Sequence, residues 1–144
     1  MSFLIEFIKE KEGFSSSPYL DAVGIPTIAY GTTYYPDGTR VAMTDVSVSK
    51  AEGEILLRHS LQSFLEYVIK YGEDNEYDWN QKQIAALTSF CYNGGKRWLR
   101  QVTDNGKRDN DTIAEKMRLY FNAGGRKLKG LETRRNGEAD HFLS

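Results

Sequence analysis

Two carboxylates and a hydroxyl near the start of the chain have types and a spacing that could perform acid–base chemistry. Asp21 follows Glu12 by nine residues, and Thr27 follows Asp21 by six. Glu12 lies on the apolar stripe and at the C-terminus of a predicted helix, a setting that favours a carboxyl group holding its proton. Asp21 lies in a polar, turn-like stretch, where a carboxylate stays ionised. Such an unlike pair is what glycoside hydrolysis requires, one group to protonate the leaving oxygen and one to activate water or stabilise the sugar cation.

The same residues also have a purely structural interpretation. In it, Glu12 is a solvated residue at a helix end, and Asp21 is a turn former. Composition and periodicity by themselves leave this interpretation open.

The elements that must position these residues can be predicted from periodicity and turn chemistry. Leu4, Ile8 and Glu12 are spaced four apart and Gly13 supplies a stop, which predicts a helix over 3–12. Between residues 19 and 41, glycines and a Pro36-Asp37-Gly38 turn punctuate runs rich in Thr, Ile, Tyr and Val. This pattern predicts a β-hairpin or meander, which we expect to be the β region of the chain.

The remainder of the chain has a helical pattern. Capping boxes begin at Ser49 and Thr112, and Asn80 is a further N-cap candidate. Helices are predicted over 49–72, 80–94, 112–124 and about 133–142.

Length and composition indicate one packed domain. The chain has 144 residues, of which 40% are hydrophobic, enough apolar surface for a single core. We predict an α+β fold with a single catalytic domain over 1–144. Its β lobe covers about 13–45, and its helical lobe covers about 46–144 together with the helix 3–12.

Charge and cysteine content exclude several function classes. The balance of 19 basic and 20 acidic residues gives a net charge of −1, too even to drive nucleic-acid or membrane binding. Cys91 is the single cysteine, so no internal disulfide forms, and no cluster has metal-ligand spacing. No apolar run reaches the roughly 18 to 20 residues of a membrane span, and the N-terminus lacks a signal peptide's pattern. We therefore expect a monomer with no cofactor, no metal, no nucleic-acid partner and no stable membrane insertion.

The spacing of Glu12, Asp21 and Thr27, with Ile28-Ala29-Tyr30-Gly31 continuing, resembles the catalytic signature of phage-type lysozymes, the endolysins of glycoside hydrolase family 24. Further segments match this family in the same order along the chain. They are 51–57, which begins Ala-Glu-Gly-Glu, 83–95, which ends Tyr-Asn-Gly-Gly, and 128–138, which contains Thr-Arg-Arg. Together these segments extend the resemblance over nearly the whole chain.

The resemblance implies a lysozyme-like fold and hydrolysis of the β-1,4 bond between N-acetylmuramic acid and N-acetylglucosamine in peptidoglycan. Glu12 would be the general acid, and Asp21 and Thr27 would hold the attacking water. Asn93 matches a position that lines the saccharide cleft, although it also suits a helix end. Arg134, or its neighbour Arg135, matches an arginine that faces the catalytic acid, and we favour Arg134 although such a pair on a helix is commonly solvated.

Tyrosines are the remaining candidates for contact with sugar. Tyr19, Tyr30, Tyr34 and Tyr35 could stack on sugar rings, and they equally suit ordinary strand positions. We assign Tyr30 to substrate binding, together with Asn93 and Arg134.

One departure from the family concerns the residue after Gly31. Many members carry histidine there, whereas this chain has Thr32. This departure keeps open a catalytically silent wall-binding module of the same fold. A second alternative is a lytic transglycosylase, which needs only the acid, although Asp21 and Thr27 at the family spacing favour a hydrolase. For an enzyme without a signal peptide, we expect residence in the host cytoplasm until pores or a delivery apparatus release it to the cell wall.

Overall fold

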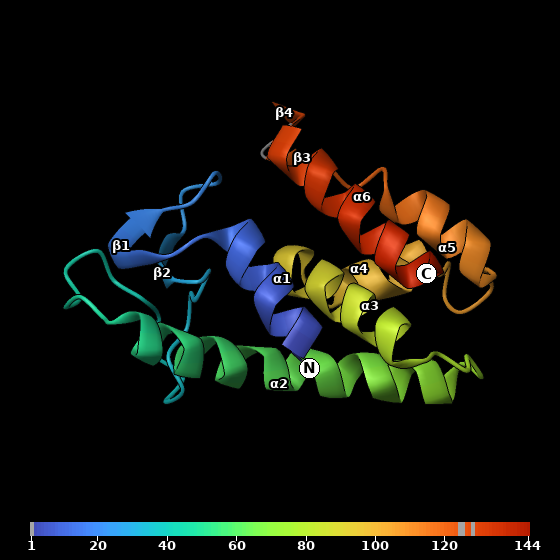
Figure 1. Cartoon of the computed structure of the whole chain (residues 1–144), viewed down its shortest axis with the longest axis horizontal. Helices are drawn as coiled ribbons and strands as arrows, with labels where there is room; N and C mark the ends of the chain where they lie inside the picture. The colour runs from blue at the N-terminus through green and yellow to red at the C-terminus, as the bar shows by residue number, and fades with distance from the viewer. Residues whose placement is uncertain (1, 124–125, 128) are drawn as a thin grey trace. The chain divides into compact units, whose positions relative to one another are not determined.

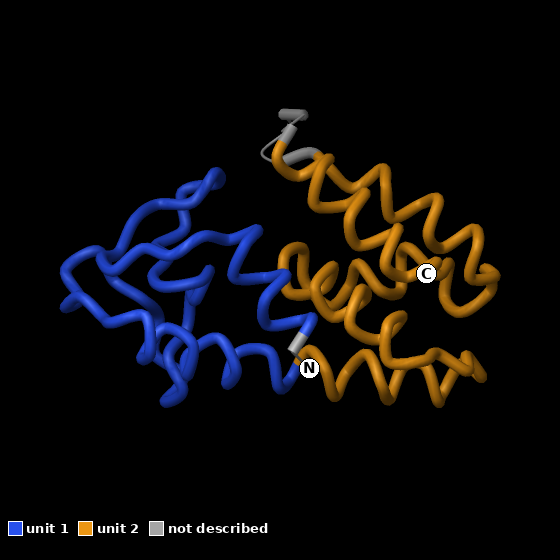
Figure 2. Tube along the Cα trace, viewed as in Figure 1, with its two compact units in different colours: residues 1–63 blue, residues 64–144 orange. Residues whose placement is uncertain are grey.

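The chain forms two compact units, residues 1–63 and 64–144 (Figure 2). The structure is a computed structural model that describes residues 2–123, 126–127 and 129–144. Unit 1 contains α1 (Ser2–Glu12), β1 (Ser15–Leu20), β2 (Pro26–Ala29) and the first part of α2 (Lys50–Asp74). Unit 2 contains the rest of α2, then α3 (Gln81–Gly94), α4 (Arg97–Val102), α5 (Asn110–Met117), β3 (Asn122–Ala123), β4 (Arg126–Lys127) and α6 (Lys129–Leu143). The predicted order of helix, small sheet and helices is confirmed.

The first helix forms where the apolar periodicity places it. Leu4, Ile5 and Ile8 are each at most 1% exposed, so one face of α1 is fully buried. The helix ends at Gly13, whose φ of +69° is readily available to glycine and whose N–H donates to the carbonyl of Lys9 at 3.0 Å. This termination leaves Glu12 as the last helical residue.

Strands β1 and β2 form an antiparallel hairpin. Tyr19 pairs with Thr27 and Leu20 with Pro26, and the register shifts between Ser15 and Tyr19. Strand β1 thus begins at Ser15, four residues before the predicted β region, because pairing resumes beyond this irregularity.

Helix α2 packs closely on the hairpin within unit 1. A Cβ added at Gly53 would lie 3.0 Å from the Phe14 ring and 3.1 Å from the Ala29 methyl group, so a glycine is needed for this approach. Ile28, Ala29 and Val41 form the small core beside it. The capping box predicted at Ser49 is confirmed, with reciprocal hydrogen bonds of 3.1 Å between Ser49 and Glu52.

Unit 2 is a helical layer in which α6 packs against both α3 and α5 (Figure 1). Asn80 and Gln83 form the capping box that begins α3, with both hydrogen bonds at 2.9 Å. The core contains buried side chains from these helices, among them Leu87, Phe90, Ile113, Met117 and Phe142. No helix in the described part of the chain is long and apolar enough to cross a bilayer.

The structure corrects the predicted boundaries in unit 2. The capping box expected at Thr112 is wrong: the preceding Asp109 is the N-cap of α5, because its carboxylate accepts the Thr112 N–H at 2.8 Å. This helix ends at Met117 rather than near residue 124, and α6 begins at Lys129 rather than near 133.

One helix and one pair of strands were not predicted. Helix α4 has only six residues and buries only Leu99 and Val102, too few to show a helical period. Strands β3 and β4 form a second antiparallel pair of two residues each, so the hairpin is not the only β region. Gly124, Gly125 and Leu128, which took part in the sequence interpretation, lie outside the described residues.

Gly94 lets the Trp98 ring lie directly over the end of α3. An added Cβ would fall within van der Waals overlap of several Trp98 ring atoms. The ring is held on its other sides by Phe90 and Tyr120, at centroid distances of 5.0 and 4.8 Å. The ring therefore has no room to move away from a larger residue at position 94.

We expect Gly94→Ala to destabilise the protein by about 1 to 3 kcal/mol, because it overpacks this contact. Gly130→Ala is the matched control: residue 130 lies in α6 with no atom within 4 Å of the added Cβ, so helix propensity should leave stability unchanged or raise it. Thermal unfolding of both variants measures the difference. Equal melting temperatures for the two variants would contradict this packing argument.

Candidate active site

The carboxyl group of Glu12 lies against the backbone of Gly31. A Cβ added at Gly31 would lie 2.9 Å from Cδ of Glu12 and 3.1 and 3.2 Å from its two oxygens. Gly31 also has a φ of +86°, which disfavours other residues. The carboxyl group at the end of α1 therefore lies in contact with the segment that follows β2.

Asp21 is oriented by the turn between β1 and β2. Its Oδ1 accepts the backbone N–H groups of Val23 and Ile25, each at 2.9 Å. Within the described part of the chain, Oδ2 accepts no hydrogen bond. Asp21 is therefore the turn former of the structural interpretation, and it still presents one oxygen to a ligand.

Thr27 shares a hydrogen-bond acceptor with Asp21. The Thr27 hydroxyl donates to the carbonyl of Ile25 at 2.8 Å, and the backbone N–H of Asp21 donates to the same carbonyl at 3.0 Å. Because the hydroxyl has a single proton, its lone pairs are left to accept from another molecule. Thr27 is 3% exposed, so only a small group such as water can approach it.

Tyr19 interacts electrostatically with both Glu12 and Asp21. Burial raises the pKa of its phenol, and the negative charges of Glu12 and Asp21 raise it further. Both carboxylates are thus close enough to Tyr19 to act on its charge, and Tyr19 is the cross-strand partner of Thr27. The structure brings Glu12, Asp21 and Thr27 to the surroundings of one side chain within unit 1.

Tyr30 is enclosed by protein. It is 5% exposed, its ring lies 5.1 Å from that of Phe14, and the ammonium group of Lys9 lies 5.5 Å from its centroid. Lys9 in turn pairs with Glu54 at 3.0 Å. This packing favours a supporting role for Tyr30 over stacking of its ring on sugar.

Thr32, which stands where many family members have histidine, is buried and 1% exposed. Its backbone exchanges two hydrogen bonds of 2.9 Å with Ile28. The segment that follows β2 therefore closes back on this strand through its backbone, without an imidazole.

Arg134 and Arg135 are buried rather than solvated, contrary to what is common for such a pair. They are 3% and 0% exposed and both contact the buried carboxylate of Glu138, at 3.3 and 2.8 Å. Ser89 donates to Glu138 at 2.5 Å and its carbonyl accepts from Arg134 at 3.2 Å. Burial raises the pKa of Glu138 against the opposing effect of the two guanidinium groups. Glu138 offsets part of the charge of the two arginines, and the Arg135 guanidinium also lies over the rings of Phe90 and Trp98, at 5.2 and 5.4 Å from their centroids.

Asn93 is exposed in the last turn of α3, immediately before Gly94. Asn93 and Arg134 both belong to unit 2, whereas the three predicted catalytic residues belong to unit 1.

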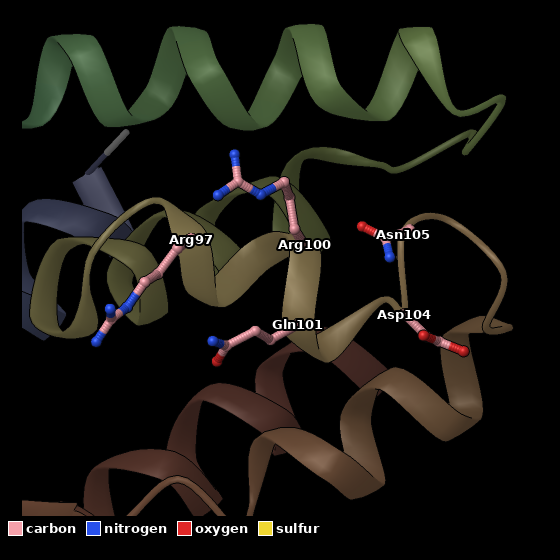
Figure 3. A pocket seen from close by; sticks show the side chains of 5 residues that line it. All are labelled: Arg97, Arg100, Gln101, Asp104 and Asn105. Carbon is pink, nitrogen blue, oxygen red and sulfur yellow. The ribbon is translucent and has the colours of Figure 1, made fainter.

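An open pocket of about 430 Å³ lies on α4 and the turn after it (Figure 3). Its lining residues are all exposed: Arg97, Arg100, Gln101, Asp104 and Asn105. It contains a single carboxylate and none of the predicted site residues, so it lacks the acid–base pair that glycoside hydrolysis needs. Among the described residues, no group of three His, Cys, Asp or Glu side chains is placed to hold a metal ion.

Comparison with known proteins identifies the family. The sequence profile of the phage lysozyme family matches residues 9–138. The chain belongs to the phage lysozyme family. Phage lysozymes are glycoside hydrolases that degrade peptidoglycan, and the carboxyl groups of Glu12 and Asp21 in unit 1 are side chains of the kind that this chemistry uses.

Relatives and solved structures support this assignment. The chain is 32% identical over 135 residues to the SAR-endolysin of bacteriophage PS119, a match covering 92% of this chain and 76% of that protein. The endolysin of the Escherichia coli phage FAHEc1 has 30% identity and a TM-score of 0.77, with 98% of this chain and 90% of that one covered. The muramidase domain of SpmX from Asticaccaulis excentricus has 26% identity and a TM-score of 0.79, with coverage of 100% and 97%. The lysozyme fold predicted from sequence is thereby confirmed.

We expect Gly31→Ala to abolish most lytic activity, because its Cβ would displace the Glu12 carboxyl group. Gly38→Ala is the matched control. Gly38 has nearly the same φ, +89°, and no atom within 4 Å of an added Cβ, so both variants should lose about 1 to 2 kcal/mol of stability from backbone strain. Clearing of a cell-wall suspension should be lost only in the Gly31 variant. Retained activity in both variants would show that the close approach does not position Glu12.

Proposed function

We propose that this lysozyme cleaves the β-1,4 bond between N-acetylmuramic acid and N-acetylglucosamine by direct attack of water. The observation that carries the proposal is the carbonyl of Ile25, which accepts hydrogen bonds from both the Asp21 N–H and the Thr27 hydroxyl. This arrangement leaves Oδ2 of Asp21 and the oxygen of the Thr27 hydroxyl able to accept from water. Together with Glu12 at the end of α1, they supply an acid and a water-binding pair.

The hydrogen-bond pattern determines how such a water is oriented. The Thr27 hydroxyl has donated its proton to Ile25, so it can only accept from water. Oδ2 of Asp21 is likewise an acceptor. A water that donates one hydrogen to Thr27 and one to Asp21 directs a lone pair away from both, toward the anomeric carbon of a bound sugar. Asp21 then receives the proton as the new C–O bond forms.

Glu12 completes the reaction from the other side of the bond. Its proton passes to the glycosidic oxygen as the C–O bond breaks, so the sugar leaves as an alcohol and Glu12 becomes a carboxylate. Proton exchange with solvent then restores both groups. Threonine cannot attack the sugar as a carboxylate would, which supports a single displacement over a covalent intermediate.

Substrate binding completes the proposal. We propose that Asn93, Tyr30 and Arg134 support saccharide binding: Asn93 is exposed and can contact the sugar, whereas Tyr30 and Arg134, which are 5% and 3% exposed, act by positioning their neighbours. The Glu138–Ser89 contacts keep the Arg134 guanidinium in one orientation. We propose that both units act together as one catalytic domain and that the enzyme works as a monomer without a metal or cofactor.

We expect Glu12→Gln to lower the rate of peptidoglycan cleavage by ~10²- to 10⁴-fold, because glutamine cannot protonate the leaving oxygen. Glu10→Gln on the same helix is the control: Glu10 is 76% exposed and contacts only Lys11 at 3.9 Å among the pairs described, so this variant should keep wild-type activity. Mass spectrometry of the products identifies the reaction. Reducing muramic acid ends are expected from wild type. Anhydro ends would indicate a transglycosylase, and no fragments from wild type would indicate a silent binding module.

A further inference from the structure

Tyr19 carries a hydroxyl group that has no hydrogen-bond partner among the described residues. Its side chain is half-buried. Within the part of the chain that the structure describes, this hydroxyl neither donates nor accepts a hydrogen bond. Tyr35, in the segment of unit 1 that follows β2, differs in this respect, since its hydroxyl donates to Oδ2 of Asp45 at 2.7 Å.

The register of the hairpin places Tyr19 on the same face as the water-binding pair. Tyr19 lies directly opposite Thr27, and directly paired residues project to the same face of an antiparallel ladder. Asp21 follows Tyr19 by two residues, and its N–H continues the pairing to Ile25, so it projects to that face as well. Tyr19, Asp21 and Thr27 therefore form one side-chain row, which we call the hairpin face.

The electrostatic surroundings support this placement. The charges of both Glu12 and Asp21 act on the phenol, and together with burial they raise its pKa. Tyr19 is thus a neutral hydrogen-bond donor throughout the physiological pH range. A neutral donor beside two carboxylates adds no charge that would disturb their division into acid and base.

We propose that the Tyr19 hydroxyl is a further substrate-binding group, which donates a hydrogen bond to an oxygen of the sugar held at the cleavage site. The proposal rests on the function proposed above, because it takes the hairpin face to be the site of cleavage. Sugar hydroxyl and acetamido oxygens are acceptors of the required kind. This donor contacts the sugar in the ground state and the transition state alike, so it contributes to substrate binding and not to the chemical step.

The test compares Tyr19→Phe with Tyr35→Phe, which removes an equivalent hydroxyl from the same unit. For Tyr19→Phe we expect KM for soluble peptidoglycan strands to rise roughly 3- to 10-fold, with kcat within a factor of two and an unchanged melting temperature. For Tyr35→Phe we expect unchanged KM and a lowered melting temperature, because the bond to Asp45 is lost.

The outcomes separate this proposal from the proposed function. If wild type releases reducing muramic acid ends and Tyr19→Phe keeps a wild-type KM, Tyr19 does not bind substrate, while the proposed function stands. If Tyr19→Phe lowers the melting temperature without changing KM, its role is structural and the proposal is overturned. If wild type releases no such ends, the proposed function fails and the assignment of Tyr19 fails with it.

Discussion

The close approach of the Glu12 carboxyl group to Gly31 is the constraint on which the rest of the site depends. An ordinary side chain at position 31 would occupy the place of that carboxyl group, with its Cβ 2.9 Å from Cδ. Gly31 follows β2 closely, and Thr27 is the second residue of this strand. One short stretch of unit 1 therefore positions both Glu12, the proposed acid, and Thr27, one member of the proposed water-binding pair.

The carbonyl of Ile25 supplies the second half of the arrangement. A carbonyl oxygen has two lone pairs, and here it accepts from both the Asp21 N–H and the Thr27 hydroxyl. These bonds use the only proton of the hydroxyl and hold the aspartate in a turn. The turn of the hairpin thus leaves the Thr27 hydroxyl and Oδ2 of Asp21 as acceptors, so the structural interpretation of Asp21 is compatible with its proposed catalytic role.

The sequence predicted long elements well where a periodic apolar face and a local cap coincide. Helix α3 starts after Asn80, as expected, because side chain and backbone at this N-cap bond reciprocally. The predicted start of α5 was wrong because Thr112 and Glu115 have the residue types of a capping box. In the structure Asp109 is the N-cap, since its carboxylate accepts the backbone N–H of Thr112. The six residues of α4 are too few for a period to be visible.

The candidate site was predictable in its residue types and not in its hydrogen bonds. The spacing of Glu12, Asp21 and Thr27 identified the carboxylates, and the structure places them around Tyr19. Strand alternation between positions 19 and 21 could have indicated that Tyr19 lies on the same face as Asp21. The sequence gives no information on whether the Tyr19 hydroxyl has a hydrogen-bond partner. The burial of Arg134 was likewise hidden, since it depends on Glu138 one turn away and on Ser89 in another helix.

The stereochemistry of cleavage tests the central claim most directly, namely that Asp21 and Thr27 hold the attacking water. Attack by a water on the face opposite the leaving group inverts the β-linkage, whereas attack by Asp21 itself would give retention and would require carboxyl groups ~5 to 5.5 Å apart instead of ~6.5 to 9.5 Å. Proton NMR of the newly released muramic acid end, recorded before mutarotation, reports the outcome. The account predicts that the α-anomer appears first. Initial appearance of the β-anomer would contradict it.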